Sequence, residues 1–239
     1  HNQTSYLLAL GFDLLPEDKR PIAVEHLLKC FGWHGWHLST GFVGTPLVCP
    51  TLSRFGKLDE AYRVLLQKTP PGWLYPVLQG ATTMWERWNS YSHEHGFGPV
   101  DMNSFNHYAY GAIGEWMYAT IAGIDLDPDP LVPAYKHSLI RPQPGGGITW
   151  ARASLDTPYG TLASHWRIEG NTFALDATVP PNTTATITLP VSANAEVEIG
   201  GGGADAAQPR STVGQTVRTE AGVSVTVAAG RYTFRASSR

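Results

Sequence analysis

Charged residues are scarce in this sequence, at 15% of 239 positions, and 20 acidic against 17 basic side chains leave a formal net charge of -3. A chain without a basic excess lacks the charge pattern that binds nucleic acid or an anionic membrane. No apolar run approaches the roughly 18 residues that a membrane-spanning helix needs. We therefore expect a globular protein whose partners include neither nucleic acid nor a membrane.

Cysteine is also rare, because Cys30 and Cys49 are the two in the chain. This number excludes a disulfide-dense scaffold and a multi-cysteine metal cluster. The spacing allows either a bridge between the two thiols or two unpaired thiols that are buried as small apolar side chains. The cysteines therefore indicate no particular cellular compartment.

The composition changes near residue 126. Helical periodicity and aromatic-rich loops dominate before it, whereas Thr, Val, Ala, Gly and Pro dominate after it. Three prolines within the segment 125–133 would interrupt any helix, so we interpret this segment as a linker. The sequence thus predicts an α-then-β protein with domains at 1–126 and 127–239.

Apolar spacing and turn residues give the expected elements. Helices are predicted at 4–15, 22–31, 46–55, 58–67, 82–89 and 104–124. Strands are predicted at 135–141, 148–154, 160–168, 172–179, 184–189, 195–199, 223–228 and 231–236, with a loop tip at 200–203. Short loops between helices indicate an antiparallel helical array, and short, regularly spaced strands indicate an antiparallel β-sandwich.

Tryptophan and histidine are concentrated in the first part, which holds six of the eight Trp and seven of the nine His. Many lie in loops, where flat rings such as that of Trp36 suit stacking on sugars, although tryptophans also fill helical cores. The histidine pairs at 34 and 37 and at 93 and 95 offer fewer than the three ligands that a zinc site requires. We expect neither a metal nor another cofactor.

The segment 79–88 places Glu86 between Trp85 and Trp88, with Arg87 beside it. A carboxylate between aromatic rings and next to a guanidinium is a candidate general base. An ion pair of Glu86 with Arg87 that braces two helices is the structural alternative.

The segment 102–116 is the second motif, in which an Asn/Ser cap begins the predicted helix and sets Asn106 and His107 in its first turns. Polar groups at the start of this helix suit contact with a ligand. Glu115, further along, fits a structural role.

With these two motifs, Gly-Ala-Thr-Thr-Met-Trp-Glu-Arg-Trp at 80–88 and Met-Asn-Ser-Phe-Asn-His-Tyr-Ala-Tyr-Gly at 102–111, the sequence resembles the α-L-rhamnosidases of glycoside hydrolase family 78. The segments 37–46 and 180–190 extend the resemblance over nearly the whole chain. It implies an (α/α)6-barrel catalytic domain followed by a C-terminal antiparallel β-sandwich, and inverting hydrolysis of terminal α-L-rhamnosides. It also implies that Glu86 is the general base and that His107 contacts the sugar. We assign substrate contact to Trp36, Trp85, Trp88 and Asn106 as well.

The family's general acid lies in an acidic motif in the first half of the barrel, which has no counterpart here. Glu94 and Asp101 are the substitutes nearest in sequence to Glu86, and solvated loop positions are the alternative for both. Five or six predicted helices fall short of the twelve in a closed barrel. We therefore expect the C-terminal part of a longer enzyme, or a barrel completed by a second copy, with rhamnose-containing glycosides as partners. The alternatives are another (α/α)6-barrel glycoside hydrolase and a non-catalytic carbohydrate-binding or scaffold fragment.

Overall fold

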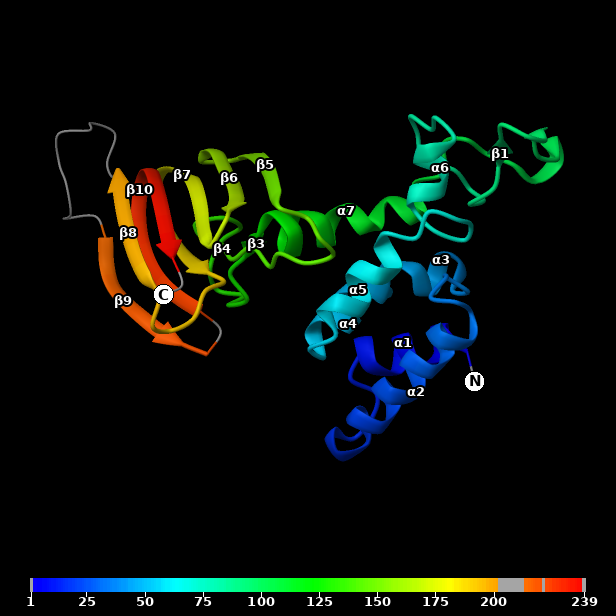
Figure 1. The fold of residues 1–239 in the computed structure, drawn as a ribbon, viewed down its shortest axis with the longest axis horizontal. Coiled ribbons are helices and arrows are strands. Elements are labelled where there is room, and N and C mark those ends of the chain that lie inside the picture. The colour runs from blue at the N-terminus through cyan, green and yellow to red at the C-terminus, as the bar shows by residue number, and fades with distance from the viewer. Residues whose placement is uncertain (1, 202–212, 221, 238–239) are drawn as a thin grey trace. The chain divides into compact units, whose positions relative to one another are not determined.

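The computed structural model describes residues 2–201, 213–220 and 222–237. The chain forms two compact units, residues 1–116 and residues 117–239, which are described here one at a time (Figure 1). The strand Glu196–Gly201 includes the first two positions of the loop tip predicted at 200–203, and positions 202 and 203 lie outside the described residues. No helix in the described ranges combines the length and apolar character needed to cross a bilayer.

The first unit is helical. Its α-helices are α1 (Gln3–Gly11), α2 (Arg20–Trp33), α3 (Gly41–Gly44), α4 (Val48–Arg54), α5 (Leu58–Leu65), α6 (Leu74–Leu78) and α7 (Ile113–Trp116). Short 3-10 turns are η1 (Glu17–Lys19), η2 (Thr45–Leu47), η3 (Val100–Met102) and η4 (Tyr108–Ala112). Helix α1 packs on α2, and α4 packs on α5 (Figure 1). The helices predicted at 4–15, 22–31, 46–55 and 58–67 are confirmed as α1, α2, α4 and α5.

One helix prediction is wrong and another is confirmed only in part. Residues 82–89 form an irregular loop, because their backbone groups bond to residues 104 and 107 rather than along a helix. The helix predicted at 104–124 is confirmed only in part: residues 104–107 are not helical, and residues 108–122 form η4, α7 and a π-helical segment, η5 (Met117–Ala122). Gly123, at φ +85°, then turns the chain, and a Cβ there would lie 2.2 Å from the nitrogen of Pro142. Asn106 and His107 therefore do not lie in a first helical turn.

Tyr62 is fully buried in the helical core, edge-on to Trp116 with ring centroids 5.2 Å apart. Burial, with the nearby Cys49 thiol as the second cause, raises the pKa of Tyr62 from 10.0 to about 12. Below pH 10 both the folded and the unfolded chain keep the phenol proton. Between pH 10 and 12 the unfolded chain ionises first, so the free energy of unfolding should fall by roughly 2 to 3 kcal/mol.

Urea unfolding measured between pH 9 and pH 12 tests this expectation, with Tyr62→Phe as the matched variant. The variant should lose less stability than the wild type over the interval from pH 10 to 12. Equal losses in the two proteins would contradict a role for this phenol. Cys49 acts in the same direction, since burial raises the pKa of its thiol, so the variant should keep part of the dependence.

The second unit is built on one eight-stranded sheet. Its strands are β3 (Ile124–Leu126), β4 (His137–Ile140), β5 (Trp150–Thr157), β6 (Gly160–Glu169), β7 (Thr172–Leu189), β8 (Glu196–Gly201), β9 (Val213–Thr219) and β10 (Gly222–Ser237). The predicted strands at 135–141, 148–154, 160–168 and 195–199 are confirmed as β4, β5, β6 and β8. The predicted pairs 172–179 with 184–189, and 223–228 with 231–236, are single long strands, β7 and β10. Strands β3 and β9 were not predicted.

The long strands β7 and β10 lie side by side and organise the sheet (Figure 1). Near one end they carry β6 and β8, and near the other end they carry β4 and β9. The register shifts between Ala228 and Gly230, where a bulge interrupts β10. Strand β4 runs parallel to β7, so the prediction of a purely antiparallel arrangement is wrong.

The segment 117–126 belongs to the second unit. Its π-helical part, η5, contacts β5 and β6, and its end, β3, pairs with β4. The proline-rich segment predicted as a linker therefore joins β3 to β4 within the sheet instead of joining the two units.

Candidate active site

Glu86 is positioned by a short backbone pairing between two loop segments. The amide of Glu86 donates to the carbonyl of Ser104 at 2.9 Å, and the amide of His107 donates to the carbonyl of Met84 at 2.9 Å. The Ser104 amide in turn donates to Oε2 of Glu86 at 2.8 Å. The two sequence motifs, which are 18 residues apart at this bond, are thus joined around one half-buried carboxylate.

Aromatic rings gather beside Glu86, and we call them, together with Glu86, the site cluster. Trp88 stacks on Tyr110 with centroids 4.0 Å apart, and Trp73 meets Trp88 edge-on at 5.6 Å. His107 stacks on Phe42 at 4.3 Å. The aromatic members of the site cluster are Phe42, Trp73, Trp88, His107 and Tyr110. The sequence motifs thus bring Glu86, Trp88 and His107 to one place.

Tyr110 links the carboxylate to the rings. Its phenol pKa is raised, first by burial and second by the negative charge of Glu86. The backbone carbonyl of Tyr110 accepts a hydrogen bond from Nε1 of Trp73 at 2.9 Å, which fixes the position of the ring stack. A neutral phenol held beside a carboxylate can donate a hydrogen bond to a ligand.

Trp85 belongs to a different group of rings. It is 5% exposed and meets Phe105 at 5.4 Å and Tyr91 at 6.4 Å. Phe97 contacts both Tyr91 and Phe105. These four residues form a small aromatic cluster in the loop, with Trp85 buried at its centre and Phe97 74% exposed, and we call this cluster the loop core. The neighbouring Trp85 and Trp88 serve different clusters, and this explains why residues 82–89 are not helical.

The other predicted contacts lie elsewhere in the same unit. Trp36, at φ +66°, stacks on Phe31 at 6.1 Å and carries the guanidinium of Arg63 over its ring at 4.2 Å. Asn106 is exposed, and its backbone amide donates a hydrogen bond to the hydroxyl of Ser104. In the described part of the chain, no recorded contact joins Trp36 or the Asn106 side chain to the site cluster.

The charged neighbours of Glu86 were also predicted to matter. Arg87 is exposed, and the ion pairs of the described residues do not include one with Glu86, so the predicted brace is absent. Glu94 lies exposed between the short strands β1 (Tyr91–Ser92) and β2 (Gly96–Phe97), and its Oε2 is 3.7 Å from Nε2 of His95. Asp101 is exposed in η3. Both alternative acids thus occupy solvated loop positions.

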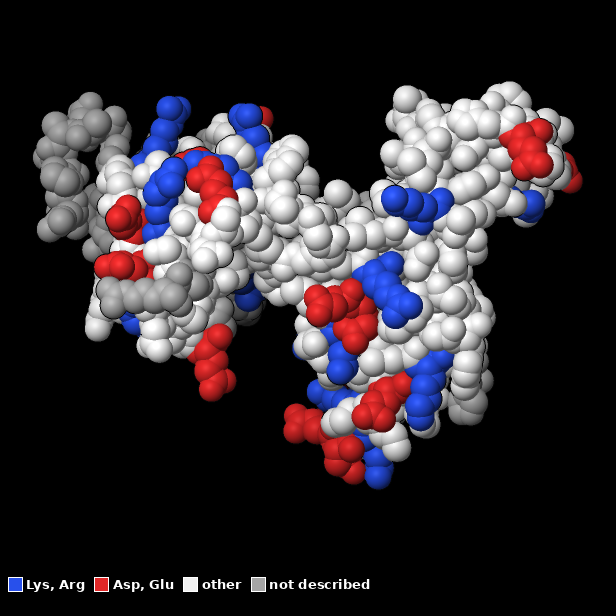
Figure 2. All heavy atoms as spheres, in the orientation of Figure 1, with Lys and Arg blue, Asp and Glu red and all other residues white. Residues whose placement is uncertain are grey.

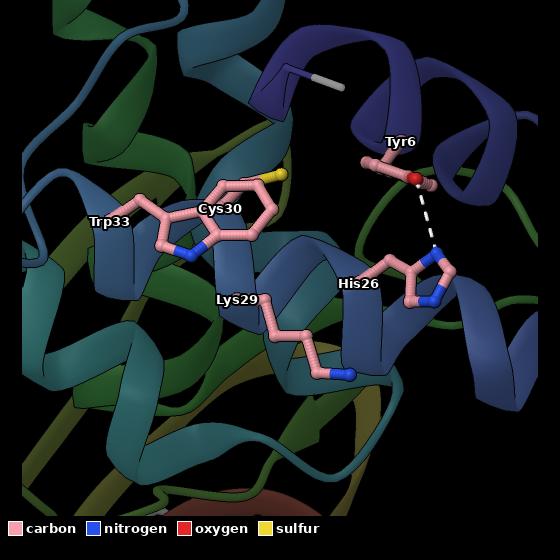
Figure 3. Close-up of a pocket in the computed structure, with 5 residues that line it drawn as sticks. All are labelled: Tyr6, His26, Lys29, Cys30 and Trp33. Carbon is pink, nitrogen blue, oxygen red and sulfur yellow. Dashed lines mark hydrogen bonds between the residues drawn. The ribbon is translucent and has the colours of Figure 1, made fainter.

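Outside the site cluster, a hollow of 130 Å³ lies between α1 and α2 (Figure 3). Tyr6 from α1 and His26 from α2 are hydrogen bonded across it at 3.2 Å, and Trp33 and Lys29 complete its lining with Cys30. It is smaller than the roughly 300 to 1,000 Å³ typical of ligand pockets. Cys30 and Cys49 are both free and buried, so the unpaired alternative is confirmed. Burial raises the pKa of the Cys30 thiol, which lowers the fraction of the reactive thiolate.

Trp73 was among the loop tryptophans suited to stacking on sugars but was not assigned to a site, and sequence reasoning missed two further members of the site cluster, Phe42 and Tyr110. Both lie in stretches that carry the family resemblance, 37–46 and 102–111. Neither has a charged or hydrogen-bonding pattern that would single it out from the sequence. Their positions follow from the tertiary packing of α3 and η4, which brings Phe42 within 5.0 Å of Tyr110.

A carboxylate set among aromatic rings on a helical array is typical of glycoside hydrolases. A family model described as the bacterial alpha-L-rhamnosidase 6 hairpin glycosidase domain matches residues 1–121. A second, the bacterial alpha-L-rhamnosidase C-terminal domain, matches residues 123–204. The chain therefore belongs to the bacterial α-L-rhamnosidase family.

Individual relatives agree with this assignment. An α-L-rhamnosidase from Formosa agariphila is 50% identical over 82% of this chain and 21% of its own length. The crystal structure of Streptomyces avermitilis α-L-rhamnosidase complexed with L-rhamnose is 42% identical, with a TM-score of 0.84 over 98% of this chain and 21% of that one. The Aspergillus terreus α-L-rhamnosidase structure is 33% identical, with a TM-score of 0.78 over 98% of this chain and 24% of that one. The chain thus spans about a fifth to a quarter of the length of these relatives.

Proposed function

We propose that this chain supplies the general base, Glu86, of an inverting α-L-rhamnosidase that hydrolyses terminal α-L-rhamnosides. The observation that carries the proposal is the setting of Glu86 in the site cluster. Among the described residues, the backbone amide of Ser104 donates a hydrogen bond to Oε2 of this carboxylate. Oε1 is then left to accept a proton from the attacking water. The rhamnose complex of the Streptomyces avermitilis relative supports the choice of sugar.

The surrounding side chains divide into three roles. Trp88 and His107 offer ring surface and a polar edge to the sugar. Trp85 acts through the loop core, which supports the segment that carries Glu86. Trp36 and Asn106 are proposed to meet parts of the substrate further from the reacting bond.

At the level of architecture, we propose that the helical unit is part of an (α/α)6 barrel, and that the barrel domain continues beyond this unit, through η5, to a boundary near residue 126, although η5 itself contacts β5 and β6. The β-rich part from 127 onward would be a C-terminal β-sandwich, antiparallel except for the pair of β4 with β7. An inverting hydrolase also needs a general acid roughly 6.5 to 9.5 Å from the base. We assign that acid to the part of the relatives that this chain does not match.

The chain by itself is expected to release no sugar from an aryl α-L-rhamnoside with a poor leaving group. General acid assistance contributes about 10² to 10⁴ in rate, and the base alone cannot protonate the leaving oxygen. Proton NMR of the incubated chain measures free rhamnose directly. Turnover by the chain alone would contradict this division of roles.

A chimera with the Streptomyces avermitilis relative would supply the general acid. In this chimera, the chain replaces the matching segment of the relative, which is about a fifth of that protein. The first sugar that this chimera releases should be β-rhamnose, because water attacks the face opposite the leaving group. Early α-rhamnose would contradict an inverting mechanism. Faster hydrolysis of another sugar in a panel of aryl glycosides would favour a different barrel hydrolase. A folded chimera that binds rhamnose without turnover would favour the binding or scaffold alternative.

A further inference from the structure

A hollow of 610 Å³, lined by both polar and apolar groups, lies on one face of the sheet in the β-rich unit, over β5, β6, β7 and β10. The opposite face of β6 carries Ser164 and Trp166, which bond to the carbonyls of η5. Because side chains alternate along a strand, His165 and Arg167 lie on the hollowed face. Figure 2 shows basic and acidic side chains side by side on this unit. The volume falls within the roughly 300 to 1,000 Å³ of ligand pockets.

The strand register explains the shape of the hollow. One row across the sheet runs from Arg152 through His165 and Asp176 to Thr233. The next row holds short side chains at its centre, with Ala163 opposite both Ser154 and Thr178, and ends at Arg231. Short side chains between longer ones leave an open floor, and both rows line the hollow.

The charges of this face are unevenly compensated. Asp176 is paired with Arg167 at 2.9 Å, and Glu169 accepts from the same guanidinium at 2.6 Å. Arg152 and Arg231 are exposed, and the ion pairs of the described residues include neither. The hollow therefore carries two uncompensated positive charges, although the whole chain has a formal net charge of -3.

The two guanidinium groups start from strands that are three strand spacings apart, from β5 across β6 and β7 to β10. At about 4.8 Å for each spacing, their strands are about 14 Å apart. A single phosphate or sulfate bound at one of these guanidinium groups would leave the other unpaired, so we take the complementary ligand to be extended, with separate negative groups.

The floor between the two arginines indicates which extended anion fits. Ser154, Thr178 and Thr233 line it, and a hydroxyl both donates and accepts hydrogen bonds, as the hydroxyls of a sugar do. Trp150 lies two residues before Arg152 on β5, so its side chain is on the same face of the sheet. It is 62% exposed and offers a flat ring on which a sugar ring can stack. We infer that this hollow binds an acidic oligosaccharide, with uronate carboxylates on Arg152 and Arg231 and sugar hydroxyls on the floor between them.

Isothermal titration of the full chain with trigalacturonate tests the inference. Binding should weaken about tenfold or more in the double variant Arg152→Gln/Arg231→Gln, because both charge-assisted hydrogen bonds are lost. The matched control is Lys19→Gln/Lys68→Gln, which removes the same charge from exposed positions of the helical unit and should bind like the wild type. Trp150→Ala should also weaken binding. The neutral trisaccharide maltotriose should bind at least about tenfold more weakly than trigalacturonate.

Several results would overturn the inference. They are the absence of trigalacturonate binding to the wild type, unchanged binding by the arginine double variant, and equal loss in the lysine control. Equal affinity for maltotriose would remove the role of the carboxylates. Equal affinity for an acidic peptide such as tetra-aspartate, or competition by inorganic phosphate at the same concentration, would show a general anion site. None of these results depends on Glu86, which lies in the other unit, so the proposed function is tested separately.

Discussion

Replacing Glu86 by Gln in the chimera with the Streptomyces avermitilis relative is expected to lower kcat for an aryl α-L-rhamnoside by about 10² to 10⁴. Glutamine keeps the shape of the side chain and can still accept the hydrogen bond from the Ser104 amide. It cannot take a proton from water, so the attacking nucleophile is no longer activated. The loss corresponds to about 3 to 5 kcal/mol of activation free energy.

The comparison needs two readouts, initial rate and affinity for L-rhamnose by titration. Affinity should stay within about threefold of the parent, because general-base catalysis acts on the transition state and adds little to ground-state binding. Glu115→Gln is the matched control, since it makes the same chemical change at an exposed position on α7. Full activity in Glu86→Gln would refute the assignment, and an equal loss in both variants would point to a nonspecific effect.

The largest expected loss of stability follows from Trp166→Ala in the β-rich unit. Trp166 is fully buried, stacks on Phe173 with centroids 5.8 Å apart, and donates from Nε1 to the carbonyl of Ile121 at 2.6 Å. Truncation leaves a cavity and removes the partner of a carbonyl at the end of η5. We expect the free energy of unfolding to fall by about 3 to 5 kcal/mol.

Urea unfolding of the full chain measures this loss. Amide hydrogen exchange of β6 and β7, monitored at each urea concentration, assigns it to the β-rich unit. Trp150→Ala is the matched control, because Trp150 is 62% exposed on β5 and its removal should change stability by less than about 0.5 kcal/mol. A loss below about 1 kcal/mol for Trp166→Ala would show that the site collapses around the smaller side chain or that the carbonyl finds another partner.

Local sequence signals predicted the elements whose own residues determine them. Helix α1 starts where Asn2 caps it, through a hydrogen bond from the Ser5 amide at 2.8 Å, and β6 alternates between its two faces as its sequence does. The stretch 104–124 has helical spacing as well, but backbone bonds to residues 84 and 86 keep its first residues, 104–107, out of the helix, and the left-handed turn at Gly123 ends it. Such long-range contacts have no local signature.

The candidate site divides in the same way. Glu86, Trp88 and His107 were predicted because charged and aromatic side chains in short motifs have a chemical meaning before any fold is known. Phe42 and Tyr110 were not, because an aromatic residue becomes part of a site only through the neighbours that packing gives it. The structural alternative, an ion pair of Glu86 with Arg87, is not among the ion pairs of the described residues, because adjacent residues can face different ways and a backbone amide from the other motif holds the carboxylate instead.

The pairing of β7 with β10 has a consequence for biosynthesis. β7 ends at Leu189 and β10, which pairs with it along nearly its whole length, begins at Gly222, which is 222 - 189 = 33 positions later. At about 5 to 20 residues per second, a ribosome needs roughly 2 to 7 seconds to cover this distance. All residues of the helical unit have been synthesised by then, whereas the edge of the 18-residue strand β7 that pairs with β10 is still unpaired. During translation this unpaired edge can associate with other chains, so it is a site where chaperone protection would act.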